Sequence, residues 1–172
     1  QAFRWSKDDN DVWHGIAFNH YLQIKQTDDS IILFDTNEET FNNIWRVYFD
    51  IDRDYSNIIK NISHNDTLKT AASYGEGIRI LRQDPWEALC SFIISQNNNI
   101  PRIKGIVERL CMNFGEKIDG GYSFPTAEKI AELTLDDLQV LRSGFRAKYI
   151  LDAAKKVANG EIDFGKFNNM NT

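Results

Sequence analysis

The residues best suited to chemistry lie in two short loops, and the first of these is rich in amides. Residues 95–102 read Ser-Gln-Asn-Asn-Asn-Ile-Pro-Arg and join two strongly apolar stretches. Amide side chains offer both hydrogen-bond donors and acceptors, which is the combination that reading base edges requires. The more ordinary interpretation is that Asn99 caps a helix with Pro101 in its first turn, while the other amides fill a turn. Both interpretations stay open at this point.

The second loop, residues 142–148, is basic and carries an aromatic side chain. It reads Arg-Ser-Gly-Phe-Arg-Ala-Lys, with three cations and no acid. Phe145 directly follows the helix-stopping Gly144 and fits neither neighbouring apolar stripe. An aromatic flanked by arginines could wedge between bases while the cations hold phosphate. The alternative is a core aromatic beside a solvated basic surface.

The elements before these loops begin with strands. Apolar and polar residues alternate with a period of two in residues 12–18, 21–25 and 31–34, with turn residues between them. This pattern predicts an antiparallel meander, to which residues 2–6 add a further strand.

Helical periodicity replaces the alternation from Thr36 onward. Thr36-Asn37-Glu38-Glu39 has the pattern of a capping box, and an apolar face follows it up to Tyr48. Two shorter helices are expected near residues 55–62 and 68–72.

The two loops lie among four further predicted helices. Asp84-Pro85-Trp86-Glu87 is a strong helix start, and the helix it opens is apolar nearly all round, as expected of a helix buried at a centre. Later apolar stripes predict a helix over residues 103–114, one capped by Thr134, and one over residues 146–159. We therefore predict an α+β fold, with an N-terminal antiparallel sheet in residues 1–80 packed on a helical domain in residues 81–172.

Composition limits the partners and cofactors. The chain has 172 residues, of which 42% are hydrophobic, and its apolar runs are too short to span a bilayer. Cys90 and Cys111 lie in apolar helical patterns, while His14, His20 and His64 are scattered without ligand spacing. We expect no metal or other cofactor, no disulfide and no membrane association, and a reducing compartment. The net charge of −5 falls within residues 1–80, so a polyanion would meet residues 81–172.

Several short motifs together carry a family resemblance. They are Gln1-Ala2-Phe3-Arg4-Trp5, Leu81-Arg82-Gln83-Asp84-Pro85, Ser91-Phe92-Ile93, Asn97-Asn98-Asn99-Ile100, Arg102-Ile103, Val107-Glu108-Arg109-Leu110-Cys111 and Gly144-Phe145-Arg146-Ala147-Lys148-Tyr149. In this order they resemble the 8-oxoguanine DNA glycosylases of the helix-hairpin-helix superfamily, over nearly the whole chain. The resemblance implies a base-excision repair enzyme with AP-lyase activity that swings 8-oxoguanine out of duplex DNA and removes it.

The resemblance also implies roles for residues in both loops. Asn97 matches the asparagine that fills the space of the extruded base and contacts the widowed cytosine. Arg102 and Arg146 match the arginines that donate to that cytosine, whose O2 and N3 are acceptors. Phe145 occupies the wedge position, at which tyrosine is also found in relatives.

Three further residues complete the expected site. Asn99 and Lys148 are expected at the DNA face, and Phe92 in the pocket that receives the base. The partner implied is double-stranded DNA containing 8-oxoguanine, bound by a monomer in the cytoplasm or nucleoid, or in the nucleus of a eukaryote.

The catalytic groups of the family have no match here. The family uses a lysine amine as nucleophile, assisted by an aspartate, beyond a glycine-rich hairpin that follows the helix ending near Asn159. The chain ends at Thr172 without such a hairpin, and the glycine expected before Gln1 is also missing. We assign no catalytic residue in this chain, and expect it to be a fragment that is inactive alone.

Two alternatives remain. An alkylated-base glycosylase of the same superfamily would share the sheet and helices but not the constellation from Asn97 to Arg102. A non-catalytic DNA-binding module would suit a chain that naturally lacks the lysine.

Overall fold

The predicted strands are present in the computed structural model, which describes residues 2–167. The four strands form one antiparallel sheet in the order β1, β2, β3, β4. Their bounds are Trp5–Lys7 for β1, Val12–Ala17 for β2, His20–Gln26 for β3 and Ile31–Phe34 for β4. The predicted meander is confirmed, although β1 begins three residues later than the expected segment 2–6.

A glycine allows the first two strands to pack closely. Trp5 lies opposite Gly15 in the register of β1 and β2. A Cβ atom on Gly15 would lie 2.1 Å from the Trp5 ring, so the indole occupies the space that any other side chain would need.

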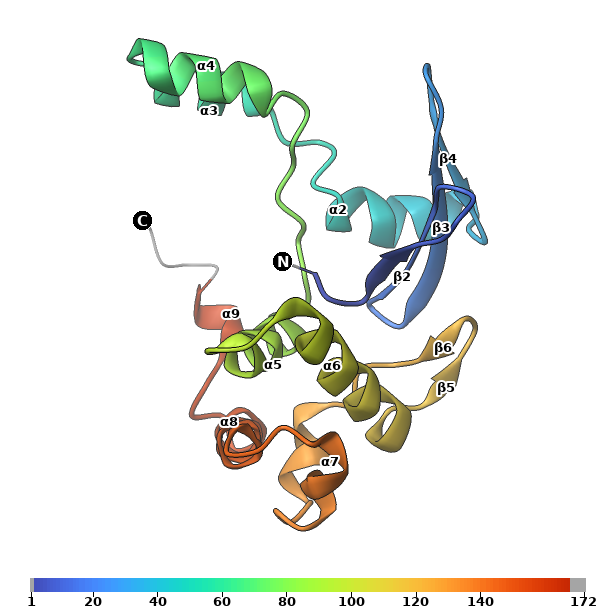
Figure 1. Cartoon of the computed structure of the whole chain (residues 1–172), viewed down its shortest axis with the longest axis vertical. Helices are drawn as coiled ribbons and strands as arrows, with labels where there is room; N and C mark the ends of the chain where they lie inside the picture. Colours follow the sequence, from blue (N-terminus) through green and yellow to red (C-terminus); the bar gives the residue numbers. More distant parts are fainter. Residues whose placement is uncertain (1, 168–172) are drawn as a thin grey trace. The chain divides into compact units, whose positions relative to one another are not determined.

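Helices follow the sheet in the same compact unit (Figure 1). Their bounds are Pro85–Ser95 for α5, Ile100–Phe114 for α6, Ala127–Ala131 for α7, Asp137–Leu141 for the 3-10 helix η2, Arg146–Ala158 for α8 and Phe164–Phe167 for α9. One hydrophobic core joins α5, α6, α7, η2 and α8. Its members without exposed surface include Cys90, Ile94, Ile106, Leu110 and Ile150.

Side-chain caps fix where the two central helices begin. The Asp84 carboxylate accepts from the Glu87 backbone N–H at 2.9 Å, and the Asn99 amide oxygen accepts from the Arg102 backbone N–H at 3.0 Å. Both predicted helix starts are therefore confirmed. Helix α5 lies in the core, as predicted, except at Phe92, which is 64% exposed.

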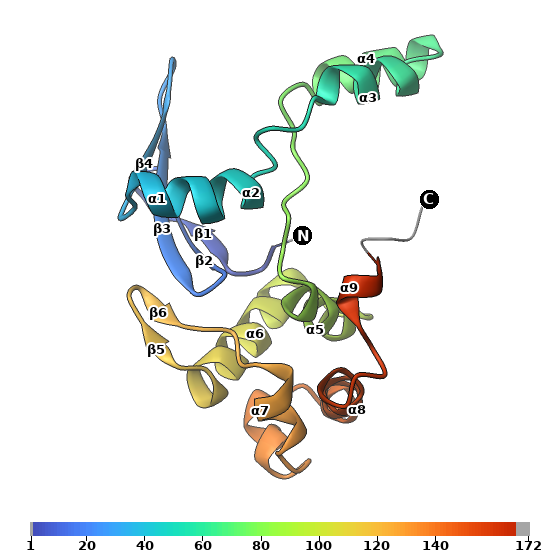
Figure 2. The same cartoon turned by 180° about the vertical axis from the view of Figure 1, so that it is seen from behind.

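Two local structures differ from the sequence prediction. Thr134 exchanges hydrogen bonds with Asp137, and the segment after it forms the short 3-10 helix η2 instead of an α-helix. A small hairpin of β5 (Lys117–Ile118) and β6 (Gly121–Tyr122), which was not predicted, follows α6 (Figure 2). Two-residue strands are too short to show alternation.

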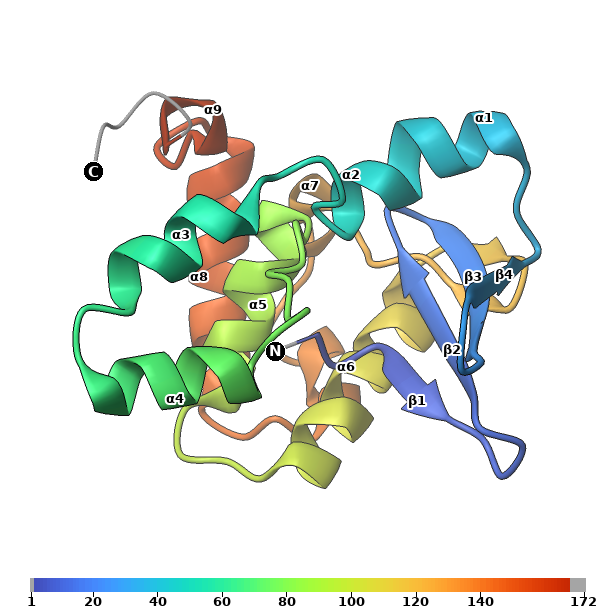
Figure 3. The same cartoon turned by 90° about the horizontal axis from the view of Figure 1, so that it is seen from above.

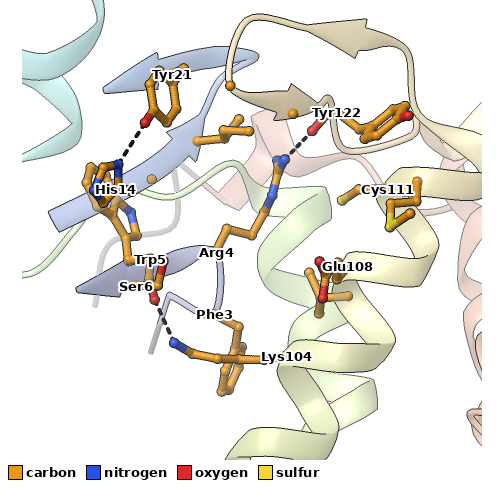
Figure 4. Close-up of a pocket in the computed structure, with 16 residues that line it drawn as sticks. Phe3, Arg4, Trp5, Ser6, His14, Tyr21, Lys104, Glu108, Cys111 and Tyr122 are labelled. Carbon is orange, nitrogen blue, oxygen red and sulfur yellow. Dashed lines mark hydrogen bonds between the residues drawn. The ribbon is translucent and has the colours of Figure 1, made fainter. Parts of the chain in front are cut away.

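The sheet is attached to the helices through two basic side chains. Arg4 donates to the Tyr122 carbonyl of β6, and Lys104 of α6 donates to the Trp5 carbonyl at 2.6 Å (Figure 4). The Arg4 guanidinium also lies 3.5 Å from the carboxylate of Glu87. Burial raises the pKa of Glu87 to about 7, an effect that Arg4 partly offsets. These contacts leave a hollow of about 430 Å³ between β1, β2 and α6.

The remaining described helices form a second compact unit, Thr36–Arg82 (Figure 3). They are α1 (Glu38–Thr40), the π-helical turn η1 (Phe41–Trp45), α2 (Arg46–Tyr48), α3 (Tyr55–Ile62) and α4 (Asp66–Tyr74). The cap of α1 is Asn37, not the predicted Thr36, since the Asn37 side chain accepts from the Thr40 N–H at 2.8 Å. Asp50 organises the next turn by accepting from Tyr55 and Arg82.

The fold is α+β, as the sequence predicts. By spatial contact the two units are Gln1–Asp35 with Gln83–Thr172, and Thr36–Arg82. The sequence division at residues 80 and 81 stays a prediction, since the contact criterion groups the sheet with the later helices. Within residues 2–167, no helix has the length and apolar content that crossing a bilayer requires.

Candidate nucleic-acid interface

The amide loop between α5 and α6 presents one side chain without a partner. Gln96 and Asn98 each donate their amide to a carbonyl in the last two turns of α5, and Asn99 caps α6. Asn97 has a left-handed backbone, with φ at +47°, and its exposed amide makes no hydrogen bond with any described residue. Helix capping and turn formation therefore account for Gln96, Asn98 and Asn99. The Asn97 amide is available to bind a ligand.

A buried arginine joins this loop to the basic loop. Arg146 is the first residue of α8 and is 4% exposed. Its Nε and Nη2 atoms donate to the Gln96 carbonyl, at 3.2 and 2.5 Å, and Nη2 also donates to the Asn97 carbonyl at 3.0 Å. Its Nη1 atom lies 3.4 Å from the Ser143 carbonyl. One guanidinium thus bridges two segments about 50 residues apart in sequence.

Phe145 is exposed beside this bridge. Its side chain is 58% exposed, and the Arg146 guanidinium carbon lies 4.6 Å from its ring centroid. The ring meets that of Tyr149 edge to face, with centroids 6.1 Å apart, and Tyr149 is itself 47% exposed. Phe145 is therefore not the core aromatic of the alternative interpretation, and two aromatic rings face solvent at the start of α8.

A basic hollow lies next to the two rings. It measures about 610 Å³, and Arg102, Arg142, Phe145 and Lys148 are among its lining residues. The three cations are exposed, and no acidic side chain lines the hollow. Residues from the first turns of α6 and α8 line it, among them Arg102 and Lys148. This arrangement suits a phosphate backbone with unstacked bases beside it.

The structure brings most of the predicted site residues together. The hydrogen bonds of Arg146 connect Asn97 with the basic loop, and the hollow connects that loop with Arg102. Asn99 lies in the same loop, with its amide oxygen used by the helix cap. Phe92 is exposed on α5 and lines neither of the two hollows.

Sequence reasoning missed Tyr149 and the bridging role of Arg146. The spacing of Phe145 and Tyr149, four residues apart, is a signal that could have found the aromatic pair. No sequence signal indicates that the Arg146 guanidinium turns inward, because its acceptors are backbone carbonyls.

The cysteine thiols and the His14 imidazole lie outside the two loops. Cys90 and Cys111 are free and buried, and burial raises the pKa of the Cys111 thiol to about 11. Among the described residues, no three His, Cys, Asp or Glu side chains gather in a way that could hold a metal ion. His14 bonds to Tyr21 and Asp8 on the sheet.

Family models match both parts of the sequence. Residues 1–89 match the model described as 8-oxoguanine DNA glycosylase, N-terminal domain. Residues 90–171 match the model of the HhH-GPD superfamily base excision DNA repair proteins.

Individual relatives agree with these matches. The N-glycosylase/DNA lyase of Saccharomyces cerevisiae is 41% identical over 122 residues, which are 67% of this chain and 32% of the yeast protein. The 8-oxoguanine glycosylase/lyase of Clostridium acetobutylicum, solved with double-stranded DNA containing cytosine opposite 8-oxoG, is 41% identical with a TM-score of 0.90. That match covers 99% of this chain and 60% of the Clostridium chain. The chain therefore spans about a third and three fifths of these two relatives.

A more distant structure shares the fold alone. The 3-methyladenine DNA-glycosylase of Archaeoglobus fulgidus has a TM-score of 0.64 at 16% identity, covering 89% of this chain and 58% of that one.

Proposed function

The chain belongs to the 8-oxoguanine DNA glycosylase family, and from this we propose that it binds duplex DNA with 8-oxoguanine opposite cytosine, as part of a repair glycosylase and AP lyase. The observation that carries the proposal is the juxtaposition of an unbonded Asn97 amide, an exposed Phe145 ring and the three exposed cations of the basic hollow. Base extrusion requires three tasks: filling the vacated space, wedging between bases and binding phosphate. The site has a suitable side chain for each of them.

Each group has a separate task in this proposal. Phe145 enters the base step and offsets the loss of stacking, with Tyr149 supporting its ring. Asn97 enters the space of the extruded base, and Arg102 donates to the acceptors of the widowed cytosine. Lys148 holds a phosphate through its charge.

Asn99, Arg146 and Phe92 have further roles in this proposal. Asn99 keeps a free amide N–H₂ group that can face DNA while its oxygen caps α6. Arg146 reaches a base only by giving up backbone carbonyls, since its guanidinium is buried. Phe92 offers an exposed aromatic face on which an extruded base could stack.

The covalent step of the family is attack by a lysine amine on the sugar C1′, which breaks the glycosidic bond and forms a Schiff base. We assign no residue of this chain to that step. The free, buried cysteines support a reducing compartment, the cytoplasm or nucleoid of a bacterium or the nucleus of a eukaryote.

Competitive binding tests the proposal directly. Fluorescence anisotropy should give tighter binding to a duplex with 8-oxoguanine opposite cytosine than to the same duplex with guanine. Equal affinities would contradict a lesion-binding role and leave a general DNA-binding module. Preference for a duplex carrying 3-methyladenine would instead support an alkylated-base glycosylase.

A further inference from the structure

We propose that Arg146 is a positioning residue that assembles the DNA face before DNA arrives, by tying Asn97 to the Phe145 loop. This inference rests on the proposed function, because it concerns how the same two loops are prepared for DNA. It assigns Arg146 a task in the DNA-free protein that is separate from any contact with a base.

The hydrogen bonds of the guanidinium give the first support. Two successive carbonyls, those of Gln96 and Asn97, accept from Arg146. They lie on either side of the Asn97 Cα atom, in the two peptides that border its left-handed backbone, whose φ is +47°. A non-glycine residue adopts this conformation at a free-energy cost, so the surrounding contacts must hold it there.

The Asn97 side chain does not stabilise this backbone conformation. Its amide makes no hydrogen bond with the described residues, whereas those of Gln96 and Asn98 are bonded to α5. The conformation of Asn97 therefore depends on its backbone partners, of which the Arg146 guanidinium is one.

The same guanidinium also contacts the other loop. It lies against the Phe145 ring, with 4.6 Å to the centroid, and reaches the Ser143 carbonyl at 3.4 Å. With 4% of the residue exposed, water competes little for these bonds. Loss of the guanidinium would remove contacts from both the amide loop and Phe145.

Arginine is the side chain suited to this task. Its planar group has five N–H donors at three nitrogen atoms, and here the three nitrogens serve three carbonyls. A lysine keeps the charge but places its donors on a single nitrogen. Arg146→Lys therefore separates the effect of the fork geometry from the effect of charge.

Amide hydrogen exchange in the DNA-free chain tests the positioning role. We expect Arg146→Lys to speed exchange roughly tenfold or more, relative to the unchanged chain, at Gln96 and Asn99, whose backbone N–H groups donate to the Ile93 carbonyl and to the Asn98 amide oxygen. Arg109→Lys is the matched control, because Arg109 also donates to a distant backbone carbonyl, that of Leu141, at 2.9 Å. The control should leave exchange in residues 96–99 unchanged.

A double-mutant cycle on lesion-duplex binding supplies the second readout. Arg146→Lys should weaken binding about tenfold when Asn97 is present and less than about twofold in an Asn97→Ala background, where there is no amide to position. A residue that only contacts the base itself, or only stabilises the fold, would weaken binding equally in both backgrounds.

The outcomes separate this inference from the proposed function. Unchanged exchange in residues 96–99, or equal binding losses in both backgrounds, would overturn the positioning role. Global unfolding of Arg146→Lys, seen as a collapsed melting transition, would assign Arg146 to the core and overturn it too. If the chain without substitutions shows no preference for the lesion duplex, the proposed function is refuted. Hydrogen exchange alone would then test whether Arg146 holds the two loops together.

Discussion

Replacing Phe145 by alanine sets function against packing, because the two predict opposite results. Phe145 is 58% exposed, so less than half of its side chain is removed from water by folding. Full burial of a phenylalanine is worth about 1.5–3 kcal/mol, and the edge contact with Tyr149 adds roughly 0.5–1.5 kcal/mol. Phe145→Ala should therefore lower the free energy of unfolding by about 1–3 kcal/mol, at or below the cost of emptying a core position.

The same substitution should slow base extrusion measurably. An aromatic stacked on a base contributes about 1–3 kcal/mol, so its loss should slow extrusion by roughly 5- to 150-fold. The assay is the fluorescence rise of 2-aminopurine placed beside 8-oxoguanine, measured by stopped flow next to thermal melting of the free chain. Phe145→Tyr, which keeps the ring, should extrude at close to the original rate.

Two controls complete this experiment. Ile150, on the same helix, is fully buried, and Ile150→Ala should cost about 2–5 kcal/mol through the cavity it leaves. Phe34→Ala removes an aromatic that is 41% exposed on β4 and should leave extrusion unchanged. If Phe145→Ala melts like Ile150→Ala and extrudes normally, the wedge assignment is refuted, and with it the basic loop as a DNA contact.

Three further predictions concern other residues. Arg102→Ala should weaken binding by about 1–3 kcal/mol more when cytosine is opposite the lesion than when adenine is, measured by anisotropy; equal losses would indicate a phosphate contact. Burial raises the pKa of Glu87 to about 7 from an ordinary 4.5, so its contribution to stability should be full below pH 4.5 and fall by up to about 3 kcal/mol as the pH rises through 7. Urea unfolding of Glu87→Gln should lack this fall, and an unchanged pH profile would refute the assignment. Cys111, whose thiol pKa is about 11, should resist iodoacetamide at neutral pH until the protein unfolds, as mass spectrometry would detect.

Local sequence signals predicted the elements whose causes are local. The strands of the meander follow from alternation, and the caps Asp84 and Asn99 from the preference of helix N-termini for side-chain acceptors. The exposure of Phe145 also agrees with its place outside either apolar stripe. In these cases the physical cause lies within a few residues of the effect.

Features that depend on contacts between residues far apart in the sequence could not be predicted from it. Phe92 interrupts the burial of α5 because only the helix surroundings decide which of its apolar faces is covered. No residue pattern indicates that the Arg146 guanidinium bonds to carbonyls about 50 residues away, and its contact with DNA stays a prediction. The left-handed backbone of Asn97 is equally invisible in residue types, since asparagine is common in ordinary turns.

The central claim is that the loops at residues 95–102 and 142–148 form one face that recognises 8-oxoguanine opposite cytosine. The most direct measurement is titration of the isotope-labelled chain with that duplex, followed by amide NMR shifts and compared with the undamaged duplex. We predict shifts concentrated in residues 96–102 and 142–149, appearing at lower concentration of the lesion duplex. Shifts centred on the sheet near His14, or the same response to both duplexes, would contradict the claim.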